Sequence, residues 1–528
     1  MAPGGATLDR VYYVDATDGS DASDGLSQHT PWQSSTKVNG GLNPGECVLF
    51  KRGEEWLHKP VAPTYVANMR PTDDGTAEAP IYFGAYGAGD KPIISAFRDT
   101  PGTTVPGNWT DYGATVTNTW YIDVVFVGTY RLFLDDVEKY SPDTAAEVNA
   151  TFPWWYGDIG GTNRLLVYSV ANPSGIVFTD GYGGFPLIVE GRRHLYFGDL
   201  DFRGGNPAVL LRSYYGTPSS YITLKDCVAG YRSWRGILQE RWAVGSPNCD
   251  HITITGCTVK GGGPPMPARL TDPTCQCDGI LFFSCDEFEV DHCTIGEWYH
   301  SSLQLQDEQH GATVRHGLVH DNTFTGDGAT YNRAYSVGGF SADSCAYNDF
   351  YDNTIDAGLC VVTQISGDHN RVFDNTFNGP AAAPPGYVDR TDIGIAMLQA
   401  RDAVITGNLF HDVAYTGLIV YSPAPGQEPV RDCIISGNTF DHCGWSPDAD
   451  PDPQFHIDGA ALHVDSYYAL TYDNIISDNV FINTLSADCI AYRSNGEPGW
   501  VYIPMTAAEF NTCSGDDGNT FSGNVRTS

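Results

Sequence analysis

One short motif recurs along the second half of the chain: VHDNTFT (residues 319–325), YDNTIDA (351–357), FDNTFNG (373–379), ITGNLFH (405–411), ISGNTFD (435–441) and ISDNVFI (476–482). Each copy places an asparagine after a β-rich run and an apolar residue two positions later. Successive copies begin roughly 22 to 41 residues apart. A repeat of this length predicts a solenoid in which each copy belongs to one coil.

Weaker copies extend the repeat in both directions, as LKDCVAG, ITGCTVK, VDHCTIG and FSGNVRT. The fixed positions are Cys227, Cys257, Cys293, Asn322, Asn353, Asn375, Asn408, Asn438, Asn479 and Asn524. In parallel coils, equivalent residues lie about 4.8 Å apart, so each amide can bond the next one and the turn backbone. We expect a structural asparagine ladder beside an inward apolar stack of Ala229, Val259, Ile295, Phe324, Ile355, Phe377, Phe410, Phe440 and Phe481.

A second stack occurs in other strands of the same coils. Period-2 alternation places one set of residues inward: Ile237, Ile280, Leu303, Val337, Val361, Ile395, Leu418, Leu462 and Ile490. The alternate residues then face outward, and they include Glu240, Phe283, Gln304, Gln306, Phe340, Gln364, Tyr421, His463, Asp465 and Arg493. Because the inward stacks fill the core, we expect any functional site on this outward side or in the adjoining loops.

Short strands also precede the clear repeats, in YYVD (12–15), CVLF (47–50) and PIYFGAYG (80–87). Residues 95–185 interrupt the pattern with several tryptophans. We therefore predict an all-β chain: N-terminal coils over 1–94, a β-rich insertion packed on the early coils over 95–185, and the main helix of about a dozen coils over 186–528.

Composition and charge exclude two classes of partner. The 528 residues include 59 glycines and 30 tyrosines, which favour turns and strands. Sixty-four acidic residues against 29 basic ones give a net charge of −35. An acidic surface repels phosphates and anionic membranes, and a stretch of about 18 apolar residues is lacking. We expect neither nucleic acid nor membrane as a partner; oligomeric state is left open.

The N-terminal run YYVDATDGSDASDGLSQHTPWQS (12–34), followed by LNPGECVLFKRGEEW (42–56) and APIYFGAYGAGDKPII (79–94), resembles the opening coils of polysaccharide-active β-helix proteins. Together with the NTF-type repeats, the chain resembles the right-handed parallel β-helix superfamily that includes pectate lyases and many glycoside hydrolases. The resemblance implies this fold, a glycan substrate and a secreted or periplasmic location. The superfamily also contains epimerases, transferases and tailspikes, so it leaves the reaction open.

The richest candidate site spans three successive coils. Its carboxylates are Asp278, Asp307, Glu308 and Glu240, which we take as catalytic candidates because glycoside hydrolysis uses two carboxylates about 5 to 10 Å apart. Asp278 stands in the run CDGI, which partly matches the Asn-Thr-Asp-Gly-Ile context of polygalacturonase-type hydrolases. Aromatic rings and polar side chains suited to sugars surround them: Arg241, Trp242, Trp234, Trp298, Tyr299, His300, Gln304 and Gln306.

A second cluster lies five or six coils further along and contains Asp392, Asp458, His463, Asp465 and Arg493. At about 25 to 30 Å from the first patch, it cannot act on the same bond. We assign no metal ligands and expect no required cofactor. Calcium is the cation that the acidic loop at 446–453 would suit, although that loop lacks the glycine and closing glutamate of an EF-hand. The cysteines, Cys275 and Cys277 included, do not complete a zinc motif and are interpreted as structural.

Three functions follow from these residues. Hydrolysis or transfer of glycosidic bonds by paired carboxylates is favoured, on a neutral glycan because the surface is acidic. The alternative is a polysaccharide lyase, since β-elimination from a uronate needs a base and a cation that neutralises the carboxylate. The second alternative is a glycan-binding or tailspike-like fibre without catalytic residues.

Overall fold

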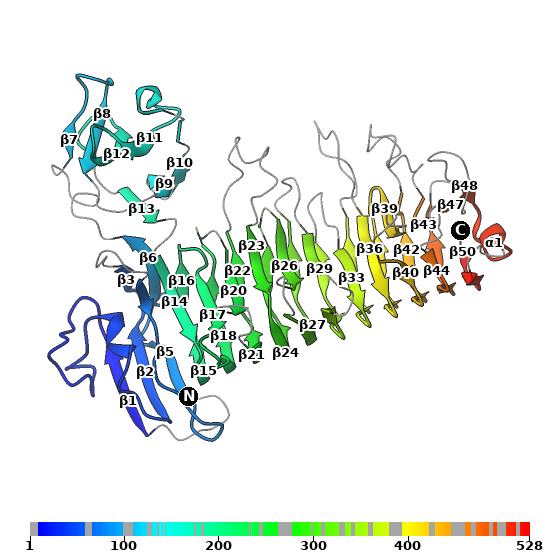
Figure 1. Cartoon of the computed structure of the whole chain (residues 1–528), viewed down its shortest axis with the longest axis horizontal. Helices are drawn as coiled ribbons and strands as arrows, with labels where there is room; N and C mark the ends of the chain where they lie inside the picture. Colours follow the sequence, from blue (N-terminus) through cyan, green and yellow to red (C-terminus); the bar gives the residue numbers. More distant parts are fainter. Residues whose placement is uncertain are drawn as a thin grey trace. The chain divides into compact units, whose positions relative to one another are not determined.

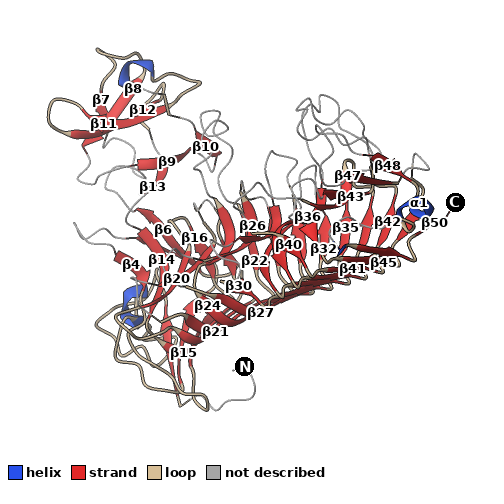
Figure 2. Ribbon diagram, turned by 45° about the vertical axis from the view of Figure 1, so that its right-hand side comes forward, coloured by secondary structure: helices blue, strands red, loops and turns tan. Residues whose placement is uncertain are grey.

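The computed structural model describes residues 9–527 except 59–65, 99–108, 124–128, 135–136, 140, 143, 174–175, 181–183, 232, 234, 242–246, 262–276, 297, 299, 308–311, 327–332, 339–343, 357–362, 380–392, 422–427, 445–459, 466–470, 485–488, 494–502 and 514–517. Nearly all regular elements are β-strands, which confirms the predicted all-β class (Figure 2). Two compact units emerge: Met1–Arg212 with Leu224–Leu238 and Gly261–Thr274, and Ser213–Thr223 with Gln239–Lys260 and Cys275–Ser528. Among the described segments, no helix has the length and apolar character to cross a membrane.

The first unit contains parallel coil strands and a separate antiparallel insertion. Its coil elements are β1 (Arg10–Val14), η2 (Ser35–Val38), β2 (Glu46–Lys51), β3 (Glu55–His58), β4 (Val66–Met69), β5 (Ile81–Tyr86), β6 (Ile93–Arg98), β14 (Gly184–Glu190), β15 (Arg193–Gly198), β16 (Asp201–Arg203) and β19 (Val228–Ala229). Strands β1, β2 and β5 pair in parallel, as predicted from their apolar runs. Phe83 and Phe197 stack in the interior with ring centroids 4.9 Å apart.

The insertion forms two antiparallel sheets. One sheet comprises β7 (Thr110–Asp111), β8 (Thr119–Asp123), β11 (Trp154–Asp158) and β12 (Asn163–Tyr168). The other comprises β9 (Thr129–Leu134), β10 (Val137–Lys139) and β13 (Ile176–Asp180). The short 3-10 helix η3 (Ala145–Glu147) lies between β10 and β11 in the sequence. Trp109, Trp154 and Leu165 belong to its small core. The insertion is thus β-rich, as the sequence indicates, while the exact domain boundaries stay predictions.

The second unit is a parallel β-helix, and Figure 1 shows its strands following one another from green to red. The first strand of each coil belongs to a row that we call the first strand row: β23 (Asp278–Phe282), β26 (Ser301–Gln306), β29 (Arg333–Gly338), β33 (Thr363–Asp368), β36 (Ile393–Arg401), β39 (Thr416–Val420), β43 (Leu462–Asp465) and β47 (Ile490–Arg493). Strands β17 (Val209–Ser213), β18 (Ser220–Lys225) and β20 (Ile237–Arg241) contain residues of both units.

Two further strand rows complete the coils. One contains β21 (Cys249–Thr255), β24 (Cys285–Asp291), β27 (Val314–His320), β30 (Cys345–Ala346), β31 (Asp349–Tyr351), β34 (Arg371–Phe373), β37 (Val404–Thr406), β40 (Val430–Arg431), β41 (Ile434–Ser436), β44 (Thr471–Tyr472), β45 (Ile475–Ser477) and β49 (Thr520–Ser522). The other contains β22 (Thr258–Lys260), β25 (Thr294–Gly296), β28 (Thr323–Thr325), β32 (Thr354–Asp356), β35 (Thr376–Asn378), β38 (Leu409–His411), β42 (Thr439–Asp441), β46 (Val480–Ile482) and β50 (Val525–Thr527).

The predicted asparagine ladder is confirmed. The Nδ2 of Asn322 donates to Oδ1 of Asn353 at 3.0 Å, and the same bond continues from Asn353 to Asn375 and from Asn375 to Asn408. Each acceptor oxygen also receives the backbone N–H of the preceding ladder residue, for example Asn322 N to Asn353 Oδ1 at 3.0 Å. Beside this ladder, phenylalanine rings stack at 4.8 to 5.1 Å from Phe377 through Phe481.

A second asparagine ladder, which the sequence reading missed, runs parallel to the first. Asn348 Nδ2 donates to Asn370 Oδ1 at 3.1 Å, and Asn474 Nδ2 donates to Asn519 Oδ1 at 3.0 Å. Each of these residues stands five positions before a residue of the first ladder, as Asn348 does before Asn353. The two corners therefore enclose a segment of constant length in each of these coils.

The inward stack of the first strand row is likewise buried, with Ile280, Leu303 and Ile395 fully enclosed. One register detail differs from the prediction: Leu303 pairs with Tyr335, and Val337 pairs with Leu305. The C-terminal end of the solenoid is closed by β48 (Ile503–Met505), antiparallel to β47, and by α1 (Ala507–Phe510). Phe510 stacks on Phe521 at 4.1 Å, and Asn524 Nδ2 donates to Asn511 Oδ1 at 2.8 Å, which ends the first ladder.

Candidate active site

Asp278 and His300 form a bonded carboxylate–imidazole pair where β23 and β26 begin. Asp278 opens β23 and pairs with Ser301 of β26, which brings His300 beside it. Asp278 Oδ1 lies 2.7 Å from His300 Nδ1, and Asp278 Oδ2 is buried without a hydrogen-bond partner among the described residues. The Asp278 side chain has no exposed surface, whereas that of His300 is 25% exposed. The imidazole is thus the part of the pair that a ligand can reach.

Gly279 explains why this carboxylate sits in a CDGI run. A Cβ at position 279 would lie 2.4 Å from the Ser302 carbonyl oxygen and 2.7 Å from Nε1 of Trp298. Only glycine lets β23 approach β26 this closely. The local sequence therefore fixes Asp278 against the coil that carries His300.

Arg333 adds a cation to the same strand ends, and the sequence analysis did not select it. It opens β29, pairs with Ser301, and its backbone N–H donates to the His300 carbonyl oxygen at 3.1 Å. Burial lowers the pKa of the Arg333 guanidinium, and the charge of Asp278 offsets this only in part. The available signal was positional: Arg333 and Asp278 are the first residues of their strands, and His300 immediately precedes its own. Three successive coils thus present a carboxylate, an imidazole and a guanidinium.

Two of the other predicted catalytic carboxylates, Asp307 and Glu240, lie at the far end of these strands. Ser301, opposite Asp278, is six residues before Asp307, which corresponds to about 20 Å along an extended strand. The Phe283 N–H donates to the Gln239 carbonyl oxygen, which places Glu240 at that far end too. Glu240 is half-buried, and Arg241 and Asp307 are almost fully buried. The structure therefore does not bring Asp278 together with Glu240 or Asp307.

Two glutamines lie between these ends on the outward side of β26. Gln304 Nε2 donates to Gln306 Oε1 at 2.9 Å, while Gln304 Oε1 is buried without a hydrogen-bond partner among the described residues. Gln304 pairs with Leu281 and with Ser336 of β29, and Ser336 pairs with Gln364 of β33. The result is a polar strip across successive coils, as the alternation predicts.

Trp298 does not offer a ring to a sugar. Its side chain is almost fully buried, and its Nε1 donates to the Val259 carbonyl oxygen at 3.0 Å. It is therefore a core residue, and its predicted exposure is wrong. The remaining candidates of the first patch, Trp234, Trp242, Tyr299 and Glu308, lie outside the described residues.

His463, in the second candidate cluster, is completely buried. It lies on the outward side of β43, paired with Ile419 and Ala491 of an apolar cluster, and its ring is 6.2 Å from that of Tyr415. Burial lowers the pKa of His463 to about 3, so the ring is neutral near pH 7. Asp465 pairs with Arg493 in the strand register. Asp392 and Asp458 lie outside the described residues, as does the acidic loop at 446–453.

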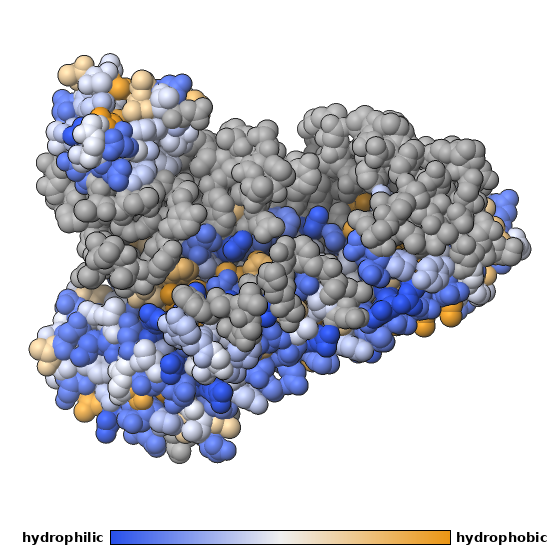
Figure 3. All heavy atoms as spheres, viewed as in Figure 1, coloured by the Kyte–Doolittle hydropathy of each residue, from blue (hydrophilic) through white to orange (hydrophobic). Residues whose placement is uncertain are grey.

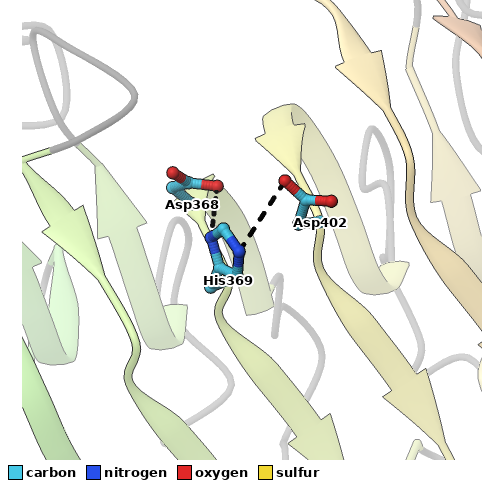
Figure 4. Close-up of side chains that lie close together, drawn as sticks. All are labelled: Asp368, His369 and Asp402. Carbon is cyan, nitrogen blue, oxygen red and sulfur yellow. Dashed lines mark ion pairs between the residues drawn. The ribbon is translucent and has the colours of Figure 1, made fainter.

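One group of side chains has the spacing of metal ligands: Asp368, His369 and Asp402, shown in Figure 4. Asp368 Oδ1 lies 2.7 Å from His369 Nδ1 and accepts a hydrogen bond of 3.0 Å from Nε of Arg401. Burial alone would raise the pKa of Asp368, but the bonds and charge of Arg401 lower it. Because a guanidinium already neutralises this carboxylate, the group fits an ion-pair network better than a cation site.

The cysteines fit the structural interpretation. No disulfide joins those in the described part of the chain. Burial raises the pKa of the Cys249 and Cys433 thiols to about 12, which keeps both protonated and unreactive near pH 7.

A family model agrees with this architecture, and several known proteins are similar to the chain. Residues 278–503 match the family model described as right handed beta helix region. A lacto-N-biosidase of Bifidobacterium longum subsp. longum is 33% identical over 146 residues, which covers 25% of this chain and 9% of that protein. Among solved structures, the GH136 lacto-N-biosidase of Eubacterium ramulus has a TM-score of 0.43 at 13% identity, covering 98% of this chain and 67% of that one. A PL6 family polysaccharide lyase from Pseudopedobacter saltans has a TM-score of 0.42 at 13% identity, covering 94% and 91%.

Proposed function

We propose that this protein is a carbohydrate-active enzyme that hydrolyses glycosidic bonds, with His300 and Asp278 at its catalytic centre. The observation that carries the proposal is the buried Asp278 carboxylate, which lies 2.7 Å from the partly exposed imidazole of His300 where β23 and β26 begin. The 33% identity to a lacto-N-biosidase over 146 residues supports a glycoside as substrate. A secreted or periplasmic location accords with a glycan substrate.

In this proposal, Asp278 orients the ring and His300 transfers the proton. A carboxylate bonded to Nδ1 holds the proton on that nitrogen, which leaves Nε2 to accept a proton from water or donate one to a leaving oxygen. Hydrolysis also needs a second acid or base about 5 to 10 Å from the first. Asp307 and Glu240 lie at the far strand end, and Glu308 directly follows Asp307 in the sequence, so we assign this second role to none of the three. Gln304 and Gln306 are proposed to bind sugar hydroxyl groups.

Two substitutions test the centre. We expect Asp278→Asn and His300→Gln each to lower the rate of reducing-sugar release by about 10² to 10⁴-fold, because each removes the oriented proton carrier. The matched control is His292→Gln, since His292 is an exposed imidazole that is likewise bonded to an aspartate, Asp291, at 2.6 Å. It should retain full activity. Thermal unfolding of each variant checks that the fold is kept.

The assay needs a panel of polysaccharides and oligosaccharides with two readouts, reducing sugar and the ultraviolet absorbance of unsaturated uronate. Reducing sugar without unsaturated uronate is expected for a hydrolase, and unsaturated uronate would instead establish a lyase. Loss of activity in Asp307→Asn or Glu240→Gln, with Asp278→Asn unaffected, would move the catalytic centre to the far strand end. Binding without any cleavage would identify a glycan-binding protein.

A further inference from the structure

Among the described side chains, Arg333 differs from three other arginines of the second unit in having no anionic partner at its guanidinium. Arg371 bonds Asp349, Arg401 bonds Asp368, and Arg431 bonds Asp432. Within the residues that the structure describes, the guanidinium of Arg333 makes no hydrogen bond or ion pair. In a chain with 64 acidic and 29 basic residues, a cation without a bonded carboxylate is unusual and calls for an explanation.

The environment of Arg333 makes this lack of a partner costly. The side chain is half-buried, and its pKa is lowered because burial outweighs the attraction of Asp278. A desolvated guanidinium is stabilised when an oxyanion fills its donor positions, and carboxylate and sulfate fit that planar fork. Asp278 Oδ1 is bonded to His300, and Asp278 Oδ2 makes no hydrogen bond to Arg333. An acidic group arriving from outside could therefore complete the shell of Arg333.

We propose that Arg333 binds an anionic substituent, carboxylate or sulfate, carried by the glycan whose bond is cleaved at His300. This inference rests on the proposed function and narrows its substrate class. The described surface visible in Figure 3 is largely hydrophilic, and the net charge of −35 opposes the approach of a polyanion. At moderate salt, repulsion between charges more than about 10 Å apart is largely screened, whereas the contact at Arg333 acts at short range. The expected ligand thus carries isolated acidic groups on a mostly neutral chain.

The test measures binding by calorimetry, separately from cleavage. Two matched pairs serve as probes: a short oligosaccharide with one uronate against its methyl ester, and a sulfated oligosaccharide against its desulfated form. At least one acidic member should bind about tenfold or more tightly than its neutral counterpart, the gain of one buried charge-assisted contact. The pair that shows the preference identifies carboxylate or sulfate as the group.

Arg333→Gln should abolish the preference. Arg371→Gln is the matched control, because Arg371 is an arginine of the same solenoid already paired with Asp349, and it should keep the preference. If Arg333→Gln does not fold, Arg333→Lys retains the charge and should keep a weaker preference. Equal binding of acidic and neutral members, or a preference that survives in Arg333→Gln, would overturn the inference. Cleavage of neutral glycans alone would also overturn it and leave the proposed hydrolase intact.

Discussion

Burial decides the protonation state of His463, and this residue makes the stability of the protein depend on pH. Its folded pKa of about 3 lies below the value of 6.5 that applies to an unfolded chain. Between these values the unfolded chain binds one more proton, so the stability contributed by the neutral ring is lost as pH falls below 6.5. His463 pairs in the strand register with Ile419 and Ala491, which both belong to an apolar cluster.

His463→Phe should remove this dependence, because phenylalanine fills the site without a titrating group. We expect the free energy of unfolding of the wild type to fall by about 2 kcal/mol more than that of the variant between pH 6.5 and about 4.5. Urea unfolding at both pH values measures the difference. Parallel losses in the two proteins would show that His463 titrates normally.

The bonded pair of Asp278 and His300 shows how far single residues can be predicted. Asp278 could be selected because it precedes glycine and opens an apolar strand. Arg333 could not, because its neighbours along the chain carry no comparable motif. Its importance comes from pairing with Ser301, 32 positions earlier in sequence, and from the burial that follows. The selection of Asp307 failed for the opposite reason. Asp307 is close to Gln304 and Gln306 in sequence, but the extended strand carries it to the end far from Asp278.

At the scale of the element, the ladder concentrates stability in a few amides. Asn375 donates to Asn408 Oδ1 and to the Phe350 carbonyl oxygen, and its own oxygen accepts from the side chain and backbone of Asn353. All these groups are buried. Removing the amide would leave several of them without partners.

We expect Asn375→Ala to lower the free energy of unfolding by about 3 kcal/mol or more, since each unsatisfied buried group costs about 1 to 3 kcal/mol. Asn378→Ala is the control, because Asn378 bonds only Asp356 at an exposed site and should cost less than about 0.5 kcal/mol. Guanidinium unfolding followed by circular dichroism gives both values. Similar losses in the two variants would argue against a stabilising ladder.

The strands and the first ladder were predictable because each coil repeats the same short motif, with its asparagine and its apolar residue at equivalent positions. The second ladder escaped because alanine and cysteine interrupt it at Ala403 and Cys433. The two ladders share one backbone feature. The residue before each ladder position adopts a left-handed conformation, as Asp374 does in the first ladder with φ of 56° and His369 does in the second with φ of 53°. Aspartate and glycine at that position were the signal that could have revealed the second corner.

At the scale of the whole molecule, a solenoid transmits stability from one coil to the next, so its ends matter more than its middle. The C-terminal end is closed by Phe510, which stacks on Phe521, and by Asn511. The Oδ1 of Asn511 accepts a hydrogen bond from Nδ2 of Asn524, the last residue of the first ladder. This closure supplies the partners that a further coil would otherwise provide.

Asn511→Ala should loosen the last coil without affecting distant ones. We expect faster amide hydrogen exchange in β49 and β50, with β23 to β28 unchanged, as measured by mass spectrometry. Asn378→Ala again serves as the comparison and should leave β49 and β50 protected. Exchange that increases uniformly along the chain would show that the end does not act as a local cap.

The constant interval of five residues between the two ladders has a consequence for engineering. Positions 348 to 353, 370 to 375, 474 to 479 and 519 to 524 all keep it, while the remainder of each coil varies in length. The segment between the two asparagine corners keeps a constant length, and the rest of each coil is free to lengthen or shorten. Whole coils, cut between equivalent asparagines, are therefore natural units for chimeric proteins in which new loops are grafted onto an unchanged frame.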